Sequence, residues 1–360
     1  MENQICARCF LDDTVEDIVF DSVGNCNYCS DFEKKNSHFV PRDLVPLVGE
    51  IKKQGKGKKY DCIVGVSGGV DSSYVLVMAV QMGLRPLAVH FDNGWNSIES
   101  QKNINNLISK LGVDLYTHVV EWGDFVSGMQ AFFDADVVDV ELLTDNALIA
   151  TLYDASKKFD VKYILNGHNR YTEGIKMPKG WNWFKLDKAN ITDILRANGI
   201  KRHKIPLIGL LDLFVYQVIY RKRLIQFLDY LKFDNNEVLE LLKTNYNYIP
   251  YPHKHYESVF TRFYQAYILP KKFNIDKRKV HYSSLLMTGQ AQKHDCQRIL
   301  LKAPFESAEI ERDKIFFLKK MSWTTDQLDS YINRRRRSHL YFKSEFKYFK
   351  LALNIWKLVN

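Results

Sequence analysis

Gly65 to Ser73 read "GVSGGVDSS", a stretch in which glycines, hydroxyl groups and one carboxylate lie close together. Glycines let backbone N–H groups approach an anion, and serine hydroxyls add further donors. Asp71 would be repelled by a bound phosphate unless a cation such as Mg²⁺ lies between them. The stretch therefore predicts a site for a phosphate-bearing ligand and magnesium. Its candidate binding residues are Ser67, Gly68, Gly69, Asp71, Ser72 and Ser73.

Four cysteines near the start of the chain have the spacing of a metal site. Cys6 and Cys9 form the pair "CARC", and Cys26 and Cys29 form the pair "CNYC". Two C-x2-C turns at this separation predict a four-thiolate zinc site, with four unrelated buried cysteines as the alternative. Gly24, just before the second pair, suits a turn that needs a positive φ. Because four thiolates leave no open coordination position, the zinc is expected to be structural.

The elements that would position these residues alternate along the chain. The run "YDCIVGV" at 60–66 is apolar and of strand length, which is typical of a strand buried on both faces. A helical pattern follows as far as Gly83, and the alternation then continues. Further strands are expected near 87–91, 115–120 and 163–166, with helices near 97–111 and 145–159. This order predicts a doubly wound parallel sheet with helices on both faces. From about residue 207 the pattern is mostly helical.

Other polar residues follow the predicted strands directly. Asp92 and Asn93 end the second strand, and Gly167, Thr172 and Glu173 follow the fourth. Ligands of open α/β sheets bind at the carboxyl ends of the strands, so these residues are candidates for the same site. Ordinary turns are the alternative interpretation.

Composition and charge restrict the class of protein. The net charge of +9 suits anionic ligands and also nucleic acid. The run Arg334 to Arg337 is either a solvated helix face or a phosphate-binding group. The start shows no signal peptide, and the longest apolar run, Leu207 to Tyr220, is short and contains Asp212. It is interpreted as a buried or subunit-contact helix. We expect a cytoplasmic protein without a membrane span, whose cysteines are reduced or bind metal.

The loop "SGGVDSS" resembles the SGGxDS motif of the PP-loop ATP pyrophosphatases, which have an adenine nucleotide alpha hydrolase-like fold. The resemblance implies that the loop holds the β- and γ-phosphates of ATP as leaving pyrophosphate, while AMP goes to the substrate. It also accounts for a missing lysine, which loops that hold a transferring γ-phosphate usually carry. "NGHNRYTEG", at 166–174, resembles the G-x-N-x-x-E stretch of ammonia-using synthetases, which implies Glu173 as a second Mg²⁺ ligand beside Asp71.

A wider set of motifs resembles the N-acetyl sugar amidotransferase family, whose members make acetamidino sugars for bacterial surface polysaccharide. The set includes the cysteine pairs, "HFDNGWN", "ELLTDNA" and "KHYESVFTRFYQAYILPKKFNIDKR", in this order along nearly the whole chain. The resemblance implies ATP-dependent adenylation of the acetamido oxygen of an activated N-acetyl sugar, followed by attack of ammonia, for lipopolysaccharide O-antigen or a similar glycan. It divides the chain into a zinc-binding segment at 1–48, a PP-loop domain at 49–206 and a helical substrate or partner region at 207–360.

Residues of the C-terminal region are candidates for binding the sugar. Lys254, Lys277 and Arg278 suit the diphosphate or carboxylate of an activated sugar, with surface solubility as the alternative. Glu257 would orient a sugar hydroxyl or ammonia, or pair with Lys254. The candidate catalytic residues are Asp71, Glu173, Lys254 and Glu257, with ATP, Mg²⁺ and structural Zn²⁺ as cofactors.

Two other functions are weighed against this one. A tRNA-thiolating PP-loop enzyme generally needs a reactive cysteine or a cluster, and after the zinc site only Cys62, inside the first strand, and Cys296, in a helical pattern, remain. A non-catalytic ATP-binding partner protein would leave the magnesium carboxylates idle. Neither cysteine has the small neighbours of a glutaminase nucleophile turn. The family resemblance implies separate glutaminase and ammonia-channelling subunits like those of imidazole-glycerol-phosphate synthase, and tRNA is not expected as a partner.

Overall fold

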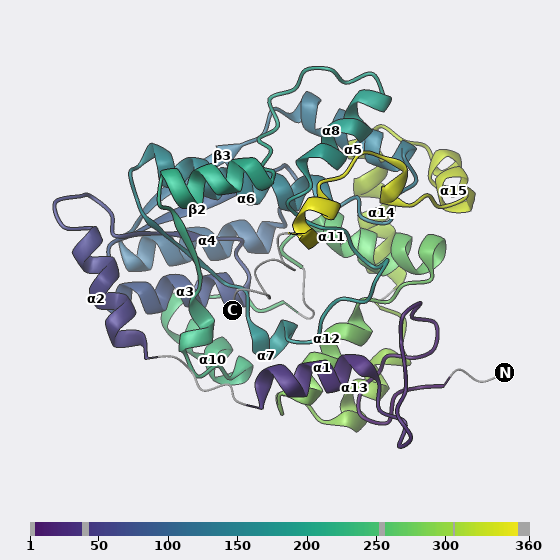
Figure 1. The fold of residues 1–360 in the computed structure, drawn as a ribbon, viewed down its shortest axis with the longest axis horizontal. Helices are drawn as coiled ribbons and strands as arrows, with labels where there is room; N and C mark the ends of the chain where they lie inside the picture. The colour runs from purple at the N-terminus through teal and green to yellow at the C-terminus, as the bar shows by residue number, and fades with distance from the viewer. Residues whose placement is uncertain (1–3, 38–42, 252–255, 305–306, 352–360) are drawn as a thin grey trace.

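The centre of the molecule is a five-stranded parallel sheet with the strand order β3-β2-β1-β4-β5 (Figure 1). The computed structural model describes residues 4–37, 43–251, 256–304 and 307–351. The strands are short, and β1 is fully buried apart from its last residue. Their bounds are β1 Cys62–Gly65, β2 Pro86–Asp92, β3 Asp114–Val119, β4 Tyr163–Asn166 and β5 Arg223–Gln226.

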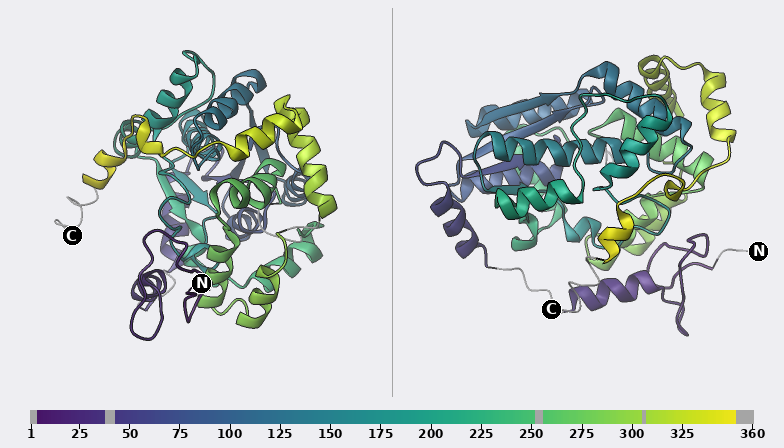
Figure 2. Two further views of the ribbon diagram at one scale, coloured as in Figure 1. Left: turned by 90° about the vertical axis from the view of Figure 1, so that its right-hand side faces the viewer. Right: turned by 45° about the horizontal axis from the view of Figure 1, so that its top comes forward.

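Helices cover both faces of this sheet because alternate side chains of each strand point to opposite sides. Cys62 and Val64 of β1 pack into one core together with α3, α4 and α10, whereas Ile63 packs into another beneath α6. Figure 2 shows the sheet between these layers. The bounds of the covering helices are α2 Leu44–Gln54, α3 Val70–Gln81, α4 Ile98–Leu111, α6 Leu142–Lys158 and α10 Asn235–Tyr246.

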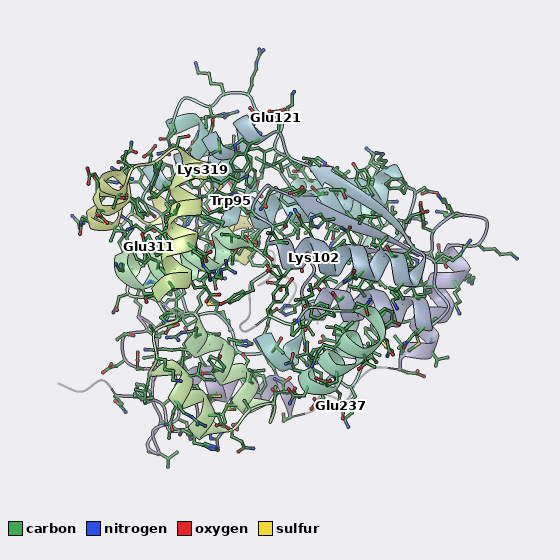
Figure 3. All side chains as sticks on the ribbon, turned by 180° about the vertical axis from the view of Figure 1, so that it is seen from behind. Trp95, Lys102, Glu121, Glu237, Glu311 and Lys319 are labelled. Atoms are coloured by element: carbon green, nitrogen blue, oxygen red, sulfur yellow. The ribbon has the colours of Figure 1, made fainter. Side chains whose placement is uncertain are left out.

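A third core lies in the helical part of the molecule and is rich in aromatic rings. Trp95, which is completely buried, packs against Phe260 and Phe317, with ring centroids 5.4 and 6.1 Å away (Figure 3). This core joins the turn after β2 to the C-terminal helices. The helices involved are α5 Trp122–Asp134, α8 Lys188–Ala197, α11 Val259–Phe263, the π-helix η3 Tyr264–Phe273, α14 Ser307–Met321 and α15 Thr325–Asn333.

The N-terminal segment lies against the helices that follow β4 (Figure 1). Arg170 donates to Asn36 at 3.2 Å, and Phe32 packs so closely on Gly174 that a side chain there would collide with its ring. The backbone N–H of Phe10 donates to Ser283 Oγ at 3.1 Å. Lys293 donates to the Ala7 carbonyl at 2.6 Å. The segment, with its own helix α1 Asn27–Asn36, therefore supports three other helices, α7 Arg170–Glu173, α12 Arg278–Met287 and α13 Lys293–Leu300.

The predicted fold class is confirmed: a doubly wound parallel sheet follows a four-cysteine segment and precedes a mostly helical region. The fifth strand lies in the region expected to be mostly helical. The remaining short elements are α9 Leu210–Phe214, η1 Val215–Ile219, η2 Phe227–Tyr230 and η4 His339–Tyr341.

The apolar run at 207–220 is not a buried helix, which corrects one of its two interpretations. It forms α9 and η1, whose Leu211, Phe214 and Val218 are 82%, 57% and 56% exposed. A role in subunit contact stays a prediction. None of the helices in the described part of the chain has the length and apolar character needed to cross a bilayer.

Candidate functional site

The candidate site lies where the chain changes direction in the sheet. β1 lies between β2 and β4 in the sheet. The chain therefore runs from β1 to β2 in one direction along the sheet and from β4 to β5 in the other, so these two connections cross opposite faces. In open α/β sheets such a switch point forms a crevice at the carboxyl ends of the strands. The predicted phosphate loop follows β1, and the stretch 167–173 follows β4. Both parts of the predicted site therefore border the same crevice.

The phosphate loop presents donors at the start of α3. Gly69 is the N-cap residue of this helix and has no side chain that could satisfy its first N–H groups. The hydroxyls of Ser67 and Ser72 lie 3.1 Å apart, and the Gly69 N–H donates to Ser67 Oγ at 3.3 Å. Ser73 is buried, and its hydroxyl has no partner among the described residues. The loop therefore offers two hydroxyls and a helix N-terminus to an anion.

Gly68 is the position in the loop where only glycine fits. Its φ is +81°, and a Cβ atom there would lie 2.5 Å from the carbonyl oxygen of Ser100. Because the obstacle is backbone of α4, it cannot turn aside as a flexible side chain would. The loop is thus packed directly against the first turn of α4.

Gly68→Ala is expected to distort the loop and weaken pyrophosphate binding at least about tenfold, since left-handed backbone costs roughly 1–2 kcal/mol and the collision adds to it. Thermal unfolding and pyrophosphate titration measure the two effects. Gly57→Ala is the matched control, because Gly57 has φ +79° and nothing within 4 Å of its Cβ position. Equal behaviour of the two variants would show that the packing on Ser100 is unimportant.

The stretch after β4 contacts the loop directly. A Cβ atom on Gly167 would lie 3.0 Å from the backbone nitrogen of Ser72, so the two segments nearly touch. Asn169 donates from Nδ2 to Asp71 Oδ1 at 3.3 Å and also caps α7. In α7, Glu173 pairs with His168 Nδ1 at 2.8 Å. Asn169 thus links Asp71 of the loop to α7, the helix that carries Glu173.

Thr172 also lies in α7 but is buried. Its Oγ1 has no hydrogen-bond partner among the described residues, and its backbone carbonyl lies 3.3 Å from His281 Nδ1 of α12. The predicted nucleotide contact of Thr172 stays a prediction.

Glu257 lies at the phosphate loop, although it comes from the C-terminal region. Its carboxylate occupies the space into which a side chain on Gly69 would project. The backbone carbonyl of Glu257 accepts from the Ser97 N–H at 2.8 Å. The next residue, Ser258, forms an isolated β-bridge with Asn96 in the turn after β2. Lys254 lies outside the described residues.

Asp92 and Asn93 stabilise the turn after β2, which is hydrogen-bonded to the backbone of Glu257. Asp92 Oδ1 accepts from the Gly94 N–H and from Asn96 Nδ2, both at 2.9 Å. The buried Asn93 accepts from the Trp95 N–H at 3.1 Å. Both side chains therefore hold the turn itself, and a direct contact with nucleotide stays a prediction.

The two basic candidates at the start of α12 already have carboxylate partners. Lys277 Nζ lies 2.8 Å from Glu141 Oε2, and both side chains are largely buried. Burial opposes ionisation of Glu141, yet the ammonium groups of Lys277 and Lys185 together outweigh it and lower the pKa of this carboxyl. Arg278 pairs with Asp276 at 2.7 Å and donates to the Lys302 carbonyl at the end of α13. Either residue would have to exchange a partner to bind an anionic sugar.

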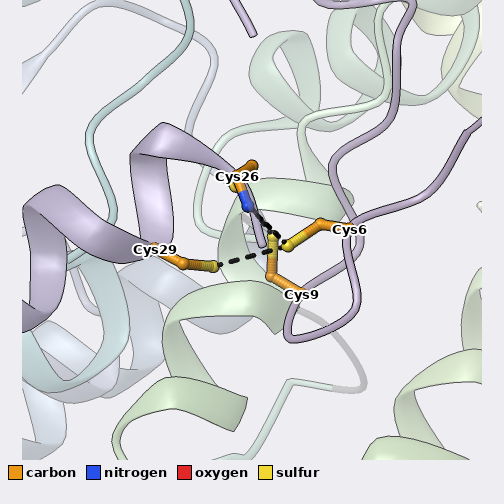
Figure 4. A group of neighbouring side chains, drawn as sticks. All are labelled: Cys6, Cys9, Cys26 and Cys29. Atoms are coloured by element: carbon orange, nitrogen blue, oxygen red, sulfur yellow. Dashed lines mark hydrogen bonds between the residues drawn. The ribbon is translucent and has the colours of Figure 1, made fainter. Parts of the chain in front are cut away.

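The four cysteines converge as predicted, and all are buried (Figure 4). Their sulfur atoms lie within 4.8 Å of one another, with Cys6–Cys29 at 3.9 Å and Cys9–Cys26 at 3.7 Å. A tetrahedral zinc with Zn–S bonds of ~2.3 Å separates its sulfurs by about 3.8 Å. The backbone N–H of Cys26 also donates to Cys6 Sγ at 3.2 Å, which favours a thiolate. The spacing of the four sulfurs therefore fits a single tetrahedral metal ion.

Sequence reasoning missed the residues that support the loop from behind. The Gly68 carbonyl accepts from Asn103 Nδ2, Tyr248 Oη and Tyr251 Oη at 3.2, 3.1 and 3.0 Å. Tyr251 lies in a stretch whose aromatic and histidine content is visible in the sequence, but no pattern links it to α4 or to the loop. No sequence pattern predicts that His168 pairs with Glu173 either.

The C-terminal part of the chain matches a family model. The model is described as "LPS biosynthesis protein WbpG-like, C-terminal domain", and the match spans residues 257–354. It begins at Glu257, the residue that lies against the phosphate loop. No curated protein matches the sequence.

Several solved structures resemble the chain loosely. NMN synthetase from Francisella tularensis is 18% identical, with a TM-score of 0.28 over 61% of this chain and 93% of that chain. The NH3-dependent NAD synthetase from Campylobacter jejuni is 14% identical, with a TM-score of 0.28 over 63% and 99%. The U34-tRNA thiolase NcsA from Methanococcus maripaludis, with its [4Fe-4S] cluster, is 13% identical, with a TM-score of 0.33 over 86% and 96%. Likenesses at this level identify neither an activity nor a ligand.

Proposed function

We propose that the chain is an ATP-dependent amidotransferase that converts the acetamido group of a nucleotide-activated N-acetyl sugar into an acetamidino group for surface polysaccharide. The observation that carries the proposal is the lysine-free loop at the switch point, with Asp71 and Glu257 at the helix N-terminus that it forms. The WbpG-like match over 257–354 supports a role in lipopolysaccharide biosynthesis.

The proposed reaction has two steps. The acetamido oxygen attacks the α-phosphorus of ATP, the bond to the β-phosphate breaks, and pyrophosphate leaves with the electron pair. Loss of the amide proton gives an imidate bonded to AMP. Ammonia then adds to the imidate carbon and AMP leaves, so that nitrogen replaces oxygen. Because the substrate carbonyl is a poor electrophile, the protein must chiefly align the reactants and stabilise charge on phosphate.

Residues of the phosphate loop and of α7 suit the binding of pyrophosphate and Mg²⁺. The Gly69 N–H and the hydroxyls of Ser67 and Ser72 would hold the departing pyrophosphate. Asp71 and Glu173 would hold Mg²⁺, because carboxylate oxygens are its preferred ligands and Asn169 links Asp71 to the helix that carries Glu173. When bound, Mg²⁺ would neutralise charge on the phosphates.

The acceptor sugar would lie on the side of Glu257. This carboxylate lies against Gly69 of the loop and would take the amide proton or orient ammonia. Lys254, Lys277 and Arg278 would bind the diphosphate of the sugar, the last two by exchanging their present carboxylate partners. Zn²⁺ would bind the four cysteines and act only on structure.

The proposal is favoured over tRNA thiolation by the state of the remaining cysteines. Cys62 is completely buried in β1, and burial raises the pKa of its thiol. Cys296 is 1% exposed in α13, and burial raises its pKa as well. A sulfur-transfer nucleophile must ionise and reach its substrate, which neither thiol does here.

The purified chain, given ATP, Mg²⁺, ammonium and a panel of nucleotide-activated N-acetyl sugars, is expected to form AMP, pyrophosphate and an acetamidino product. High ammonium should support the reaction and glutamine should not, because neither buried thiol can act as a glutaminase nucleophile. Mass spectrometry detects the change of oxygen to NH, and glutamate release measures any glutaminase activity.

Two controls make this test decisive. Omission of the sugar should suppress AMP formation if adenylation is coupled to the acceptor. Binding of tRNA should be weak and fall steeply with salt, as expected from the basic surface alone. Thiolated tRNA, or tRNA binding that survives moderate salt, would contradict the proposal in favour of thiolation. Glutamate release without a partner would refute the requirement for a separate glutaminase.

A further inference from the structure

The carbonyl oxygen of Gly68 has an unusual number of donors. A carbonyl has two lone pairs, yet this one receives three side-chain donors, from Asn103, Tyr248 and Tyr251. Asn103 is completely buried and Tyr248 is 4% exposed. Burial raises the pKa of both tyrosine hydroxyls, so each remains a donor at any physiological pH. The orientation of this one peptide group is therefore fixed by three separate side chains.

The opposite side of the same peptide faces the anion site. In a trans peptide the C=O and the following N–H point in opposite directions. Holding the Gly68 carbonyl therefore aims the Gly69 N–H towards the open side of the loop, where it now meets Ser67 Oγ. A phosphate oxygen would take the place of that hydroxyl.

The two tyrosines belong to the segment that leads to Glu257. Asn103 anchors this segment on α4, because its amide accepts from the Ile249 N–H at 2.7 Å and donates to the Ile249 carbonyl at 3.0 Å. Asn106 donates to the Asn247 carbonyl at 2.8 Å, one turn further along the helix. Beyond the undescribed residues 252–255, the chain returns to the loop at Glu257. The chain thus contacts Gly68 through Tyr248 and Tyr251, and Gly69 through Glu257.

We propose that Asn103, Tyr248 and Tyr251 form a tyrosine clamp, a group of positioning residues that presets the Gly69 N–H for the pyrophosphate of ATP. The two tyrosines lie in the segment that leads to Glu257, so the clamp joins the loop to that part of the chain. This inference rests on the proposed function for the identity of the nucleotide. It adds to that function by assigning the preorganisation of the loop to residues far from it in sequence.

The test compares Tyr248→Phe, Tyr251→Phe and the double variant with the unmodified chain. Each substitution removes one hydroxyl and keeps the ring, and Asn103 still donates to Gly68 in all of them. Magnesium pyrophosphate affinity, measured by calorimetry, is expected to fall about two- to tenfold for each single variant and further for the double variant. In turnover assays the KM for ATP should rise more than kcat falls. Tyr246→Phe is the matched control, because it removes a hydroxyl from the end of α10 and no donor to Gly68.

The results separate a positioning role of the clamp from a purely structural one and from failure of the proposed function. A structural role alone would lower the melting temperature and leave pyrophosphate affinity unchanged, and that result would overturn the clamp. If the unmodified chain binds pyrophosphate and the double variant binds it equally well, the clamp is refuted while the proposed function stands. If the unmodified chain binds neither ATP nor pyrophosphate, both proposals are wrong. If Tyr248→Phe folds poorly, the test relies on Tyr251→Phe, because Tyr251 is only half-buried.

Discussion

Asp71→Asn is expected to lower the rate of AMP formation about 100- to 1000-fold, the usual cost of removing one group that stabilises transition-state charge. Asparagine has the same shape as aspartate and can still accept from Asn169 Nδ2, so the contact between the loop and the stretch after β4 is kept. What is lost is the negative charge that would hold Mg²⁺ beside the phosphates. The loss should be largest at low magnesium and should leave the melting temperature nearly unchanged.

Glu237→Gln is the matched control for this variant. Glu237 also lies in the first turn of a helix on the same face of the sheet, but it is exposed at α10 (Figure 3). Its replacement should leave turnover unchanged. Quantitative analysis of the nucleotide products completes the experiment. Release of ADP and phosphate by the unmodified chain would contradict cleavage between the α- and β-phosphates and with it the assigned role of the loop.

The parts of the site that the sequence predicts are those built from contiguous residues. The phosphate loop, the C-x2-C pairs and the strands around them are read from local pattern, because strand, turn and helix follow one another within a few residues. Gly24 adopts φ +84°, as its place before the second cysteine pair predicts. The four sulfurs converge for the same reason, since each pair lies on a local turn.

The parts that the sequence does not predict are made by contacts between distant segments. Tyr248 and Tyr251 reach Gly68 across 180 and 183 residues, and no periodicity records such a pairing. β5 is a four-residue strand at the edge of the sheet, with exposed ends, so its pattern lacks the apolar run of a buried strand. Lys277 has a cationic side chain suited to phosphate, yet tertiary structure places it against Glu141.

Cys26→Ser is expected to remove the metal and to loosen other parts of the molecule as well as the N-terminal segment. Structural zinc sites contribute about 10–16 kcal/mol in small zinc-binding peptides, which is comparable with the stability of a whole domain at about 5–15 kcal/mol. The cage holds α1, and α1 packs on α7 through Phe32 and Arg170. Loss of the metal should therefore expose residues 4–37 to protease and also impair turnover, because α7 carries Glu173. Chelation of the unmodified chain should reproduce both effects.

Cys296→Ser is the control for this experiment, since Cys296 is equally buried but lies in α13 outside the four-thiol cage. It should keep one metal ion per chain and its protease resistance. Elemental analysis of the unmodified chain should find zinc, and a stoichiometric iron–sulfur chromophore would refute the identity of the metal. A Cys26→Ser protein that retains its metal and its full resistance would contradict the structural role. Retained turnover in a metal-free protein would show instead that α7 holds its position without α1, so the brace would be dispensable to the site.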